Sequence, residues 1–302
     1  MEYRILGSTG ERVSAVGLGG AHLAMAPDRA AAARIIHAAI DGGVTFLDNS
    51  WDYALGECEI RMGEALLGGH RDKVFLMTKI NGQTRDAAAG QIDQCLEHLR
   101  TDRIDLVQLH EMIRPEDPER TCGPGGAVEA LVAAREAGKI RYIGFTGHKD
   151  PTVHLAMLEQ GFAFDTVQMP LNVLDHHFRS FEARVLPVLV ERGIGVLGMK
   201  PLANGRLAKV DAVSPEECLR YALSLPASVV ITGCENLENV EQALRVGNGF
   251  TPMSDAELAD IRARSATIPG GPQGEIERWK TGGEYDGTNT HPHWLTTASY
   301  SA

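Results

Sequence analysis

The chain has 302 residues, of which 43% are hydrophobic and 23% charged, and it carries a net charge of −11. Because no basic block offsets this acidic balance, the sequence predicts neither a nucleic-acid partner nor an anionic membrane partner. The five cysteines are scattered without metal-binding spacing, and no stretch approaches the roughly 20 apolar residues of a membrane span, so we expect a cytoplasmic protein.

The N-terminal half begins with a predicted hairpin over residues 3–17, which turns at Gly7–Gly10. Strand-like and helix-like patterns alternate after it. We expect strands at 17–23, 44–47, 73–79 and 104–110, and helices at 28–41, 57–67, 86–100 and 126–137. Asp28 is the expected N-cap of the first of these helices, and Gly42-Gly43 is its expected end.

The C-terminal half keeps the same alternation. We expect strands at 140–145, 164–169, 193–199 and 228–231, and helices at 151–160, 181–192, 214–224 and 237–245. The segment 268–302 differs, because it is rich in Gly, Thr, Pro and aromatic residues. Its large aromatic side chains favour an ordered loop packed on the body over a disordered end; they are Trp279, Tyr285 and Trp294.

Alternation of this kind requires a parallel sheet, and eight strand-and-helix units match an α/β fold of the (β/α)8 TIM-barrel type. An open doubly wound sheet is the alternative, and it would place a glycine-rich turn between the first strand and the first helix. Gly17-Leu18-Gly19-Gly20 has the glycines, but the apolar run continues to Leu23. We therefore expect one barrel domain over residues 1–302, with the hairpin at its start and the tail 268–302 over its mouth.

Three consecutive predicted strands end in complementary polar side chains, those of Asp48, Lys79 and His110. Catalytic residues of such barrels lie at the carboxyl ends of the strands, so we expect these three to meet Tyr53 from the turn after Asp48. A tyrosine, with an ordinary pKa of about 10, can donate a proton when a nearby ammonium stabilises its anion. Asp48 would offset the buried charge of Lys79, and His110 would orient a carbonyl oxygen. Because no side chain donates hydride, a reduction here requires a nicotinamide.

The chain resembles the aldo-keto reductase superfamily from Tyr3 to Leu244. The resemblance implies an NAD(P)H-dependent oxidoreductase that reversibly reduces a small aldehyde or ketone to an alcohol, with Tyr53 as the proton donor, Lys79 and Asp48 as its tuning pair and His110 as the orienting residue. The motifs that carry it are Leu47-Asp48-x-x-x-x-Tyr53, the strand-end Lys79 and His110, and the opening Leu6-Gly7-x-Thr9-Gly10-x-x-Val13-Ser14-x-x-Gly17-Leu18-Gly19.

The resemblance also implies a cleft for the dinucleotide. Thr146 and Gln168 would bind the carboxamide, and Met199 stands where the family often stacks an aromatic ring on the nicotinamide. The loop Pro201–Leu207 would wrap the pyrophosphate, with Arg206 as its ionic partner. The other cofactor-binding residues that we expect are Lys200, Leu202, Gly205, Gly233, Glu235, Asn239 and Gln242.

Glu235 lies where relatives usually place a lysine or arginine against the 2′-phosphate of NADP. A carboxylate would repel that phosphate, but it could accept hydrogen bonds from the free ribose hydroxyls of NAD. The expected cofactor is therefore NADP(H) or NAD(H), with a weakened preference for NADP. Asn239 and Gln242 would face the adenine end.

His22, Trp51 and Trp294 are the expected substrate-pocket residues, together with the loop 111–125. No metal is expected. Three further histidines sit in different loops without a carboxylate at ligand spacing, and we interpret them as surface residues; they are His148, His176 and His177.

Two other classes of function stay open. A lyase or aldolase would use the strand-end Lys200 or Lys79 as a Schiff-base amine, and borohydride would trap it without any need for a nicotinamide. A non-catalytic nicotinamide-binding protein of the same fold would not need Tyr53 and Lys79 together. The variant Tyr53→Phe discriminates, since the predicted enzyme would lose turnover and still bind its cofactor.

Overall fold

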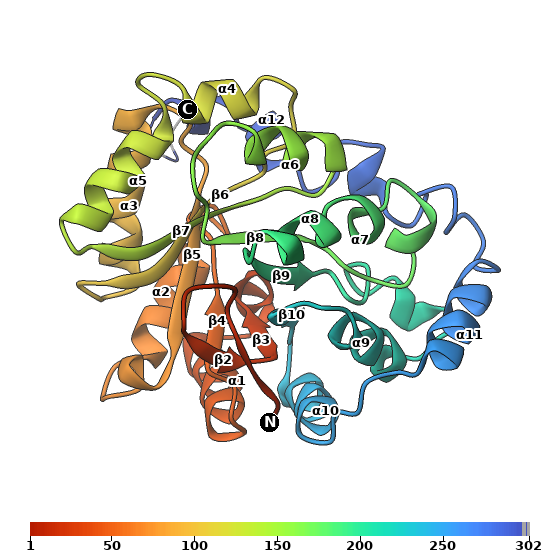
Figure 1. Cartoon of the computed structure of the whole chain (residues 1–302). Helices are drawn as coiled ribbons and strands as arrows, with labels where there is room; N and C mark the ends of the chain where they lie inside the picture. The colour runs from red at the N-terminus through yellow and green to blue at the C-terminus, as the bar shows by residue number, and fades with distance from the viewer. Residues whose placement is uncertain (298–299, 301–302) are drawn as a thin grey trace.

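Eight parallel strands close into a barrel in the computed structural model, which describes residues 1–297 and 300 (Figure 1). The strands follow one another around the barrel in chain order, and the last pairs with the first. The predicted (β/α)8 barrel is confirmed, and the doubly wound alternative is wrong. The barrel strands are β3 (Val16–Gly19), β4 (Phe46–Asp48), β5 (Phe75–Ile80), β6 (Ile104–Leu109), β7 (Ile140–Thr146), β8 (Thr166–Pro170), β9 (Gly195–Met199) and β10 (Val229–Gly233).

Helices surround the barrel, and side-chain caps begin several of them. Asp28 accepts a hydrogen bond from Ala31 N, as predicted, and Ser214 forms a capping box with Glu217. The α-helices are α1 (Arg29–Asp41), α2 (Glu57–Ala65), α3 (Arg85–His98), α4 (Asp117–Cys122), α5 (Ala127–Glu136), α6 (Pro151–Leu158), α7 (Phe181–Arg184), α8 (Leu186–Glu191), α9 (Pro215–Ser224), α10 (Leu237–Asn248), α11 (Asp255–Ser265) and α12 (Gly287–Thr290). The 3₁₀ helices are η1 (Gly20–Met25), η2 (Arg71–Lys73), η3 (Asp175–His177), η4 (Leu207–Lys209), η5 (Arg278–Lys280) and η6 (Pro292–Leu295).

Two predicted elements differ from the structure by more than a small shift of their ends. The helix expected at 181–192 is divided into α7 and α8, because Pro187 has no N–H to continue the hydrogen-bond ladder. The first barrel strand ends at Gly19 instead of residue 23, and η1 follows it. A Cβ on Gly20 would lie 2.6 Å from the carbonyl oxygen of Asp48, so this close approach requires a glycine.

Helix α11 was not predicted, although the sequence contains its start signal. Ser254 accepts a hydrogen bond from Glu257 N, and the Glu257 carboxylate accepts one from Ser254 N. This reciprocal capping box has the sequence signature Ser-x-x-Glu, but the apolar periodicity that follows it is too weak to predict a helix. Helix α4, which lies in the loop expected at 111–125, was not predicted either.

The N-terminal hairpin closes one end of the barrel. Strands β1 (Tyr3–Ile5) and β2 (Arg12–Ser14) pair antiparallel, as predicted. Leu6 and Val13 are buried, in one cluster with the inward-facing residues Phe46, Phe75, Met77, Leu106, Leu197, Val229 and Ile231. The hairpin, drawn in dark red, lies in the lower part of Figure 1, near the N-terminus.

The C-terminal segment packs on the body of the protein, as predicted. Trp279 and Trp294 are buried, and Gln83 N donates to Leu295 O at 2.8 Å. Residues 298–299 and 301–302 of the predicted tail lie outside the described residues. No helix in the described part of the chain combines the length and the apolar character that a membrane crossing requires.

Candidate active site

Asp48, Tyr53, Lys79 and His110 meet at the carboxyl end of the barrel. Lys79 Nζ donates to Asp48 Oδ1 at 2.5 Å, to Asn49 O at 2.6 Å and to Tyr53 Oη at 3.2 Å. The His110 ring lies edge-on to the Tyr53 ring, with 5.8 Å between their centroids. Asp48 ends β4, Lys79 lies in β5, and His110 directly follows β6, so three neighbouring strands place the charged side chains that the sequence pointed to.

A strained turn holds Tyr53 over Lys79. Three consecutive residues, Ala54, Leu55 and Gly56, adopt positive φ angles of 50°, 54° and 86°. Left-handed φ angles are costly for non-glycine residues, so the surrounding structure must hold this turn in place. The Trp51 N–H donates to Lys79 O at 2.9 Å, which fastens the start of the turn to β5.

The electrostatic environment keeps Tyr53 protonated. Burial raises the pKa of Tyr53 well above its usual value, and the carboxylates of Asp48, Asp52 and Glu111 raise it further. The tuning of the phenol by Lys79 stays a prediction, because the hydrogen bond from Lys79 to Tyr53 Oη is present beside these groups that raise the pKa. The Lys79 ammonium is already bonded to Asp48, which weakens its attraction for a phenolate.

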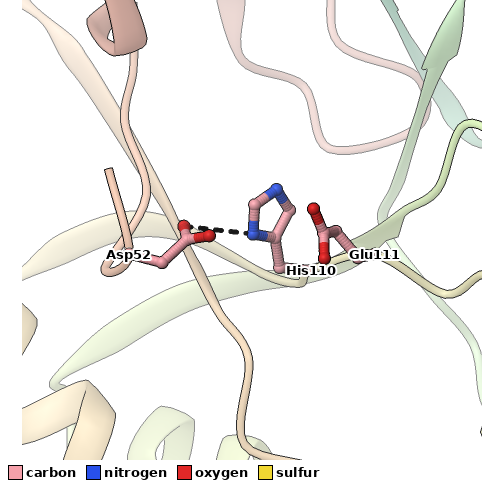
Figure 2. A group of neighbouring side chains, drawn as sticks. All are labelled: Asp52, His110 and Glu111. Carbon is pink, nitrogen blue, oxygen red and sulfur yellow. Dashed lines mark ion pairs between the residues drawn. The ribbon is translucent and has the colours of Figure 1, made fainter. Parts of the chain in front are cut away.

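Two acidic side chains that the sequence analysis did not single out complete this group. Asp52 and Glu111 flank the ring of His110, as Figure 2 shows, and Asp52 Oδ1 lies 3.3 Å from His110 Nδ1. Burial opposes ionisation of Asp52, but His110 and the Ser50 hydroxyl lower the pKa of its carboxyl below the usual value. Asp52 directly precedes Tyr53 in the sequence, and Glu111 directly follows His110. This adjacency is the sequence feature that could have indicated that they belong to the site.

The oxygen and nitrogen atoms of Asp52, His110 and Glu111 lie within 4.8 Å of one another, as in a metal-binding group. Their hydrogen bonds account for this arrangement without an ion. Glu111 accepts from Gly287 N, Thr288 N and Thr288 Oγ1 at 3.0–3.2 Å. Asp52 accepts from the Ser50 hydroxyl and pairs with His110. We therefore assign no metal to this group.

A cavity of about 890 Å³ opens at this end of the barrel. Its lining includes most of the predicted site residues: Asp48, Tyr53, His110, Thr146, Gln168, Met199, Lys200, Leu202, Gly205, Gly233, Glu235, Asn239, Gln242, His22 and Trp294. Lys79 lies behind Tyr53 and is only 1% exposed. A cavity of this volume, lined by both charged and polar groups, suits a dinucleotide together with a small substrate.

Trp51 and Arg206 do not belong to this lining. Trp51 is fully buried, stacks on Tyr300 and donates its indole N–H to Gln94. Its ring therefore packs in the interior beside the turn that carries Tyr53, and not against the cavity. Arg206 donates to Ile276 O and pairs with Glu284 at 2.6 Å. The guanidinium of Arg206, which was expected to bind a pyrophosphate, is thus paired with the C-terminal segment.

His148 was interpreted as a surface residue, and this is wrong. It is 3% exposed, lines the cavity and contacts Asp286 Oδ1 through Nε2 at 3.2 Å. Burial lowers the pKa of His148 to about 4, so the ring is neutral at physiological pH.

Gln168 has the features of a carboxamide-binding residue. Its Nε2 reaches Asp48 Oδ2 at 3.4 Å, while its Oε1 is buried and has no hydrogen-bond partner among the described residues. An orphaned acceptor costs free energy unless a ligand donates to it. The amide N–H₂ of a nicotinamide carboxamide is a suitable donor. Asn204 Nδ2, in the predicted pyrophosphate loop, is a buried donor that also has no partner in the part of the chain that the structure describes.

The far end of the cavity is more exposed and carries Glu235. This carboxylate lies 3.2 Å from His22 Nδ1, and the two side chains are 47% and 33% exposed. Glu235 comes from the loop after β10 and His22 from η1, so their contact joins two neighbouring strand ends.

The C-terminal segment contributes Tyr285 and Asp286 to the lining of the cavity. Two ion pairs hold this segment in place: Asp286 pairs with Lys149, and Lys280 pairs with Asp175 at 2.7 Å in a fully buried contact. Lys200 points toward this segment, with its Nζ 5.7 Å from the ring centroids of both Trp279 and Tyr285. Burial lowers the pKa of Lys200 to about 8.

Comparison with known proteins identifies the family of this chain. Residues 15–214 match the sequence profile of the Aldo/keto reductase family. The chain is 32% identical to the Uncharacterized oxidoreductase YrpG of Bacillus subtilis, over 68% of each protein. It is 29% identical to Aldo-keto reductase dtxS3 of Metarhizium robertsii, over 92% of this chain and 85% of that one.

The fold is shared with solved structures. The holo form of aldo-keto reductase AKR11C1 from Bacillus halodurans superimposes with a TM-score of 0.72 at 23% identity, over 87% of this chain and 96% of that one. Family and fold together support an oxidoreductase function. The chain is a member of the aldo/keto reductase family.

Proposed function

We propose that the protein catalyses reversible hydride transfer between a nicotinamide dinucleotide and a small aldehyde or ketone, with Tyr53 as the proton donor. The observation that carries this proposal is the hydrogen bond of 3.2 Å from Lys79 Nζ to Tyr53 Oη at the wall of the cavity. A nicotinamide, when bound, supplies the hydride. Thr146, Gln168 and Met199 line the part of the cavity where the ring would lie.

The residues of this chain manage the proton. The raised pKa of Tyr53 keeps its hydroxyl protonated across the neutral range, so the phenol has a proton to donate, but it is a weak acid unless its anion is stabilised. When the proton leaves, the ammonium of Lys79 is within hydrogen-bond distance of the phenolate that remains. Asp48 neutralises Lys79 in the resting state, which makes the burial of the ammonium tolerable.

Glu235 supports a weakened preference for NADP. Its carboxylate lines the far end of the cavity and is 47% exposed. A negative charge there would repel a 2′-phosphate and accept hydrogen bonds from an unmodified ribose. We therefore propose that NAD(H) is used at least as well as NADP(H).

The direct test is a screen of aldehydes and ketones with NADH and with NADPH, followed at the absorbance of the reduced nicotinamide. For an active pair we expect Tyr53→Phe to lower kcat by about 10²–10⁴-fold, the range of a lost general acid, with dinucleotide affinity unchanged. Full activity of this variant would remove Tyr53 from the mechanism. Borohydride trapping in the absence of a dinucleotide would instead support the Schiff-base lyase.

A further inference from the structure

Lys200 lines the cavity as a cation without a carboxylate partner. No acidic side chain among the described residues forms an ion pair with it, and the polar contact of its Nζ is the Met199 sulfur at 3.8 Å. A thioether is a weak acceptor. The ring centroids of Trp279 and Tyr285 are both 5.7 Å away, close to the limit of about 6 Å for a cation–π contact. These neighbours therefore stabilise the ammonium only weakly.

Three lysines that contact the catalytic group or the C-terminal segment are each paired with a carboxylate. The pairs are Lys79–Asp48, Lys149–Asp286 and Lys280–Asp175. An ammonium that leaves water needs such a partner, because burial penalises its charge. Burial lowers the pKa of Lys200 to about 8, so its amine is partly desolvated but still carries its charge at neutral pH. An anionic group bound at Nζ would supply the missing partner.

The backbone at Lys200 is strained. Its φ angle is 56°, in the left-handed region where glycine or asparagine is the usual residue. A lysine in this region costs free energy, and such residues cluster at active sites and ligand-binding sites. Lys200 directly follows β9, so the strained residue stands at the carboxyl end of the barrel, where the catalytic group lies. A ligand that the long side chain reaches would account for this strain.

Lys200 is close enough to the catalytic group to feel its charges. After burial, the largest influences on the pKa of Lys200 are the charges of Glu111, Lys79 and Asp48. A ligand group held by Lys200 therefore belongs to a molecule that lies at the catalytic group.

The acidic side chains nearby decide which anion fits. Glu111 accepts hydrogen bonds from Thr288, and Asp48 accepts one from Lys79, so both have donors of their own. Their charges would repel a dianionic phosphate about twice as strongly as a carboxylate, and one ammonium balances only one negative charge. A single carboxylate is therefore the group that fits Lys200.

We propose that Lys200 binds a carboxylate of the substrate, so that the protein prefers aldehydes or ketones that carry a carboxylate over neutral ones of the same shape. This inference rests on the proposed carbonyl–alcohol chemistry and names the class of its substrate. The ammonium donates to the carboxylate oxygens, and a hydrogen bond between two charged groups is stronger than one between neutral groups. Lys200 is then a specificity residue for the substrate, although the family resemblance placed it with the cofactor.

The pyrophosphate of a bound dinucleotide is the other source of anionic oxygens. The loop that follows Lys200 offers separate donors for it. Asn204 Nδ2 has no partner in the described part of the chain, and the exposed Lys209 lines the cavity. Loss of a substrate contact would change the preference among carbonyl compounds, whereas loss of a phosphate contact would change dinucleotide affinity.

Paired aldehydes test the preference in the wild type. The probes are 3-formylbenzoate, 4-formylbenzoate and the two corresponding formylphenylacetates, each compared with its primary amide at neutral pH and saturating dinucleotide. We expect at least one acid to have a kcat/KM about 10- to 100-fold above that of its amide, the range for a hydrogen bond to a charged group. A ratio of one or below for all four pairs would overturn the proposal, and this result needs no variant.

Variants at two lysines of the cavity lining sharpen the test. Lys200→Met keeps the length of the side chain without its charge, and we expect the acid-to-amide ratio to fall to about one, the value for equal recognition of the two probes. Lys200→Arg keeps the charge and should retain a ratio well above that. Lys209→Met is the matched control, because it removes the same charge elsewhere in the lining, and its ratio should equal that of the wild type. A wild-type ratio in a folded Lys200→Met protein would contradict the proposal.

Two further measurements separate other roles of Lys200. Calorimetry should show that Lys200→Met binds NADH and NADPH as the wild type does. Weaker dinucleotide binding with an unchanged acid-to-amide ratio would assign Lys200 to the pyrophosphate and overturn the proposal. Hydrogen exchange in residues 279–286 detects a purely structural role. Faster exchange there, with equal losses of kcat/KM for acids and amides, would overturn the proposal as well.

Binding without turnover separates this inference from the proposed function. Benzoate and phenylacetate are compared with their amides by calorimetry, on the wild type and on Lys200→Met. We expect the acids to bind more tightly than the amides only when Lys200 is present. If no aldehyde is reduced but the acids still bind through Lys200, the proposed function fails and the carboxylate site stands. If aldehydes are reduced without any preference for acids, the proposed function stands and the carboxylate site fails.

Discussion

The two ends of the cavity differ in how their charged side chains are held. At the catalytic end, Lys79 and Asp48 are 1% and 5% exposed and lie 2.5 Å apart. At the far end, Glu235 and His22 are 47% and 33% exposed and lie 3.2 Å apart. Buried pairs lose several kcal/mol when one partner is removed, whereas exposed pairs contribute about 0–1 kcal/mol. We therefore expect substitutions to cost more stability at the buried catalytic end than at the exposed end that carries Glu235.

Lys79→Met should have the largest effect of any substitution at the catalytic end. It would leave the Asp48 carboxylate buried without its cation, at a cost of about 3–5 kcal/mol in the free energy of unfolding. It would also remove the ammonium that contacts Tyr53, so turnover should be lost. Chemical denaturation and single-turnover rates measure the two effects. The double variant Lys79→Met with Asp48→Asn is the control, and it should recover stability without recovering activity.

Also at the catalytic end, Glu111 binds the C-terminal segment through Gly287 and Thr288. Glu111→Ala would leave the N–H groups of Gly287 and Thr288 without an acceptor, and each buried unpaired group costs about 1–3 kcal/mol. We expect faster hydrogen exchange in residues 283–297 and a higher KM, with a smaller change in kcat. Glu111→Gln keeps one acceptor oxygen and should lie between the alanine variant and the wild type. Unchanged protection of the segment in Glu111→Ala would show that other contacts hold it.

The smallest effect is expected at the exposed end. Glu235→Lys should raise kcat/KM for NADPH relative to NADH by about tenfold, because it exchanges a repulsive charge for an attractive one at a solvent-exposed site. Glu235→Gln, which only removes the charge, should give a smaller shift. A large NADPH advantage in the wild type would mean that Glu235 does not face the 2′ position.

Local sequence patterns predicted both the fold and the catalytic group. The fold depends on the order of strands and helices, and the catalytic group depends on the residues at the strand ends. The alternation of strands and helices required a parallel barrel, and its register then brought the ends of β4, β5 and β6 together. Ser254 could have predicted α11 through its capping box, and Pro187 could have predicted the break between α7 and α8. These signals are local and readable.

The remaining site features depend on contacts between distant residues. Arg206 was expected to bind a phosphate, but its partner Glu284 comes 78 residues later in the chain. Trp51 adjoins the catalytic turn in sequence, and nothing local indicates that its ring points away from the cavity. The contact of Asp52 with His110 joins the loops after two different strands, and the pKa of Tyr53 depends on its burial and on carboxylates that follow or end two different strands. Such features follow only from the folded barrel.

The most direct test is a single-turnover reduction with a dinucleotide deuterated at the transferred position, run on the wild type and on Tyr53→Phe. We expect deuterium on the former carbonyl carbon of the wild-type product, and a rate at least about 100-fold lower in the variant at equal dinucleotide occupancy. A variant that transfers the label at the wild-type rate would contradict the account, because the phenol beside Lys79 would then have no part in the reaction.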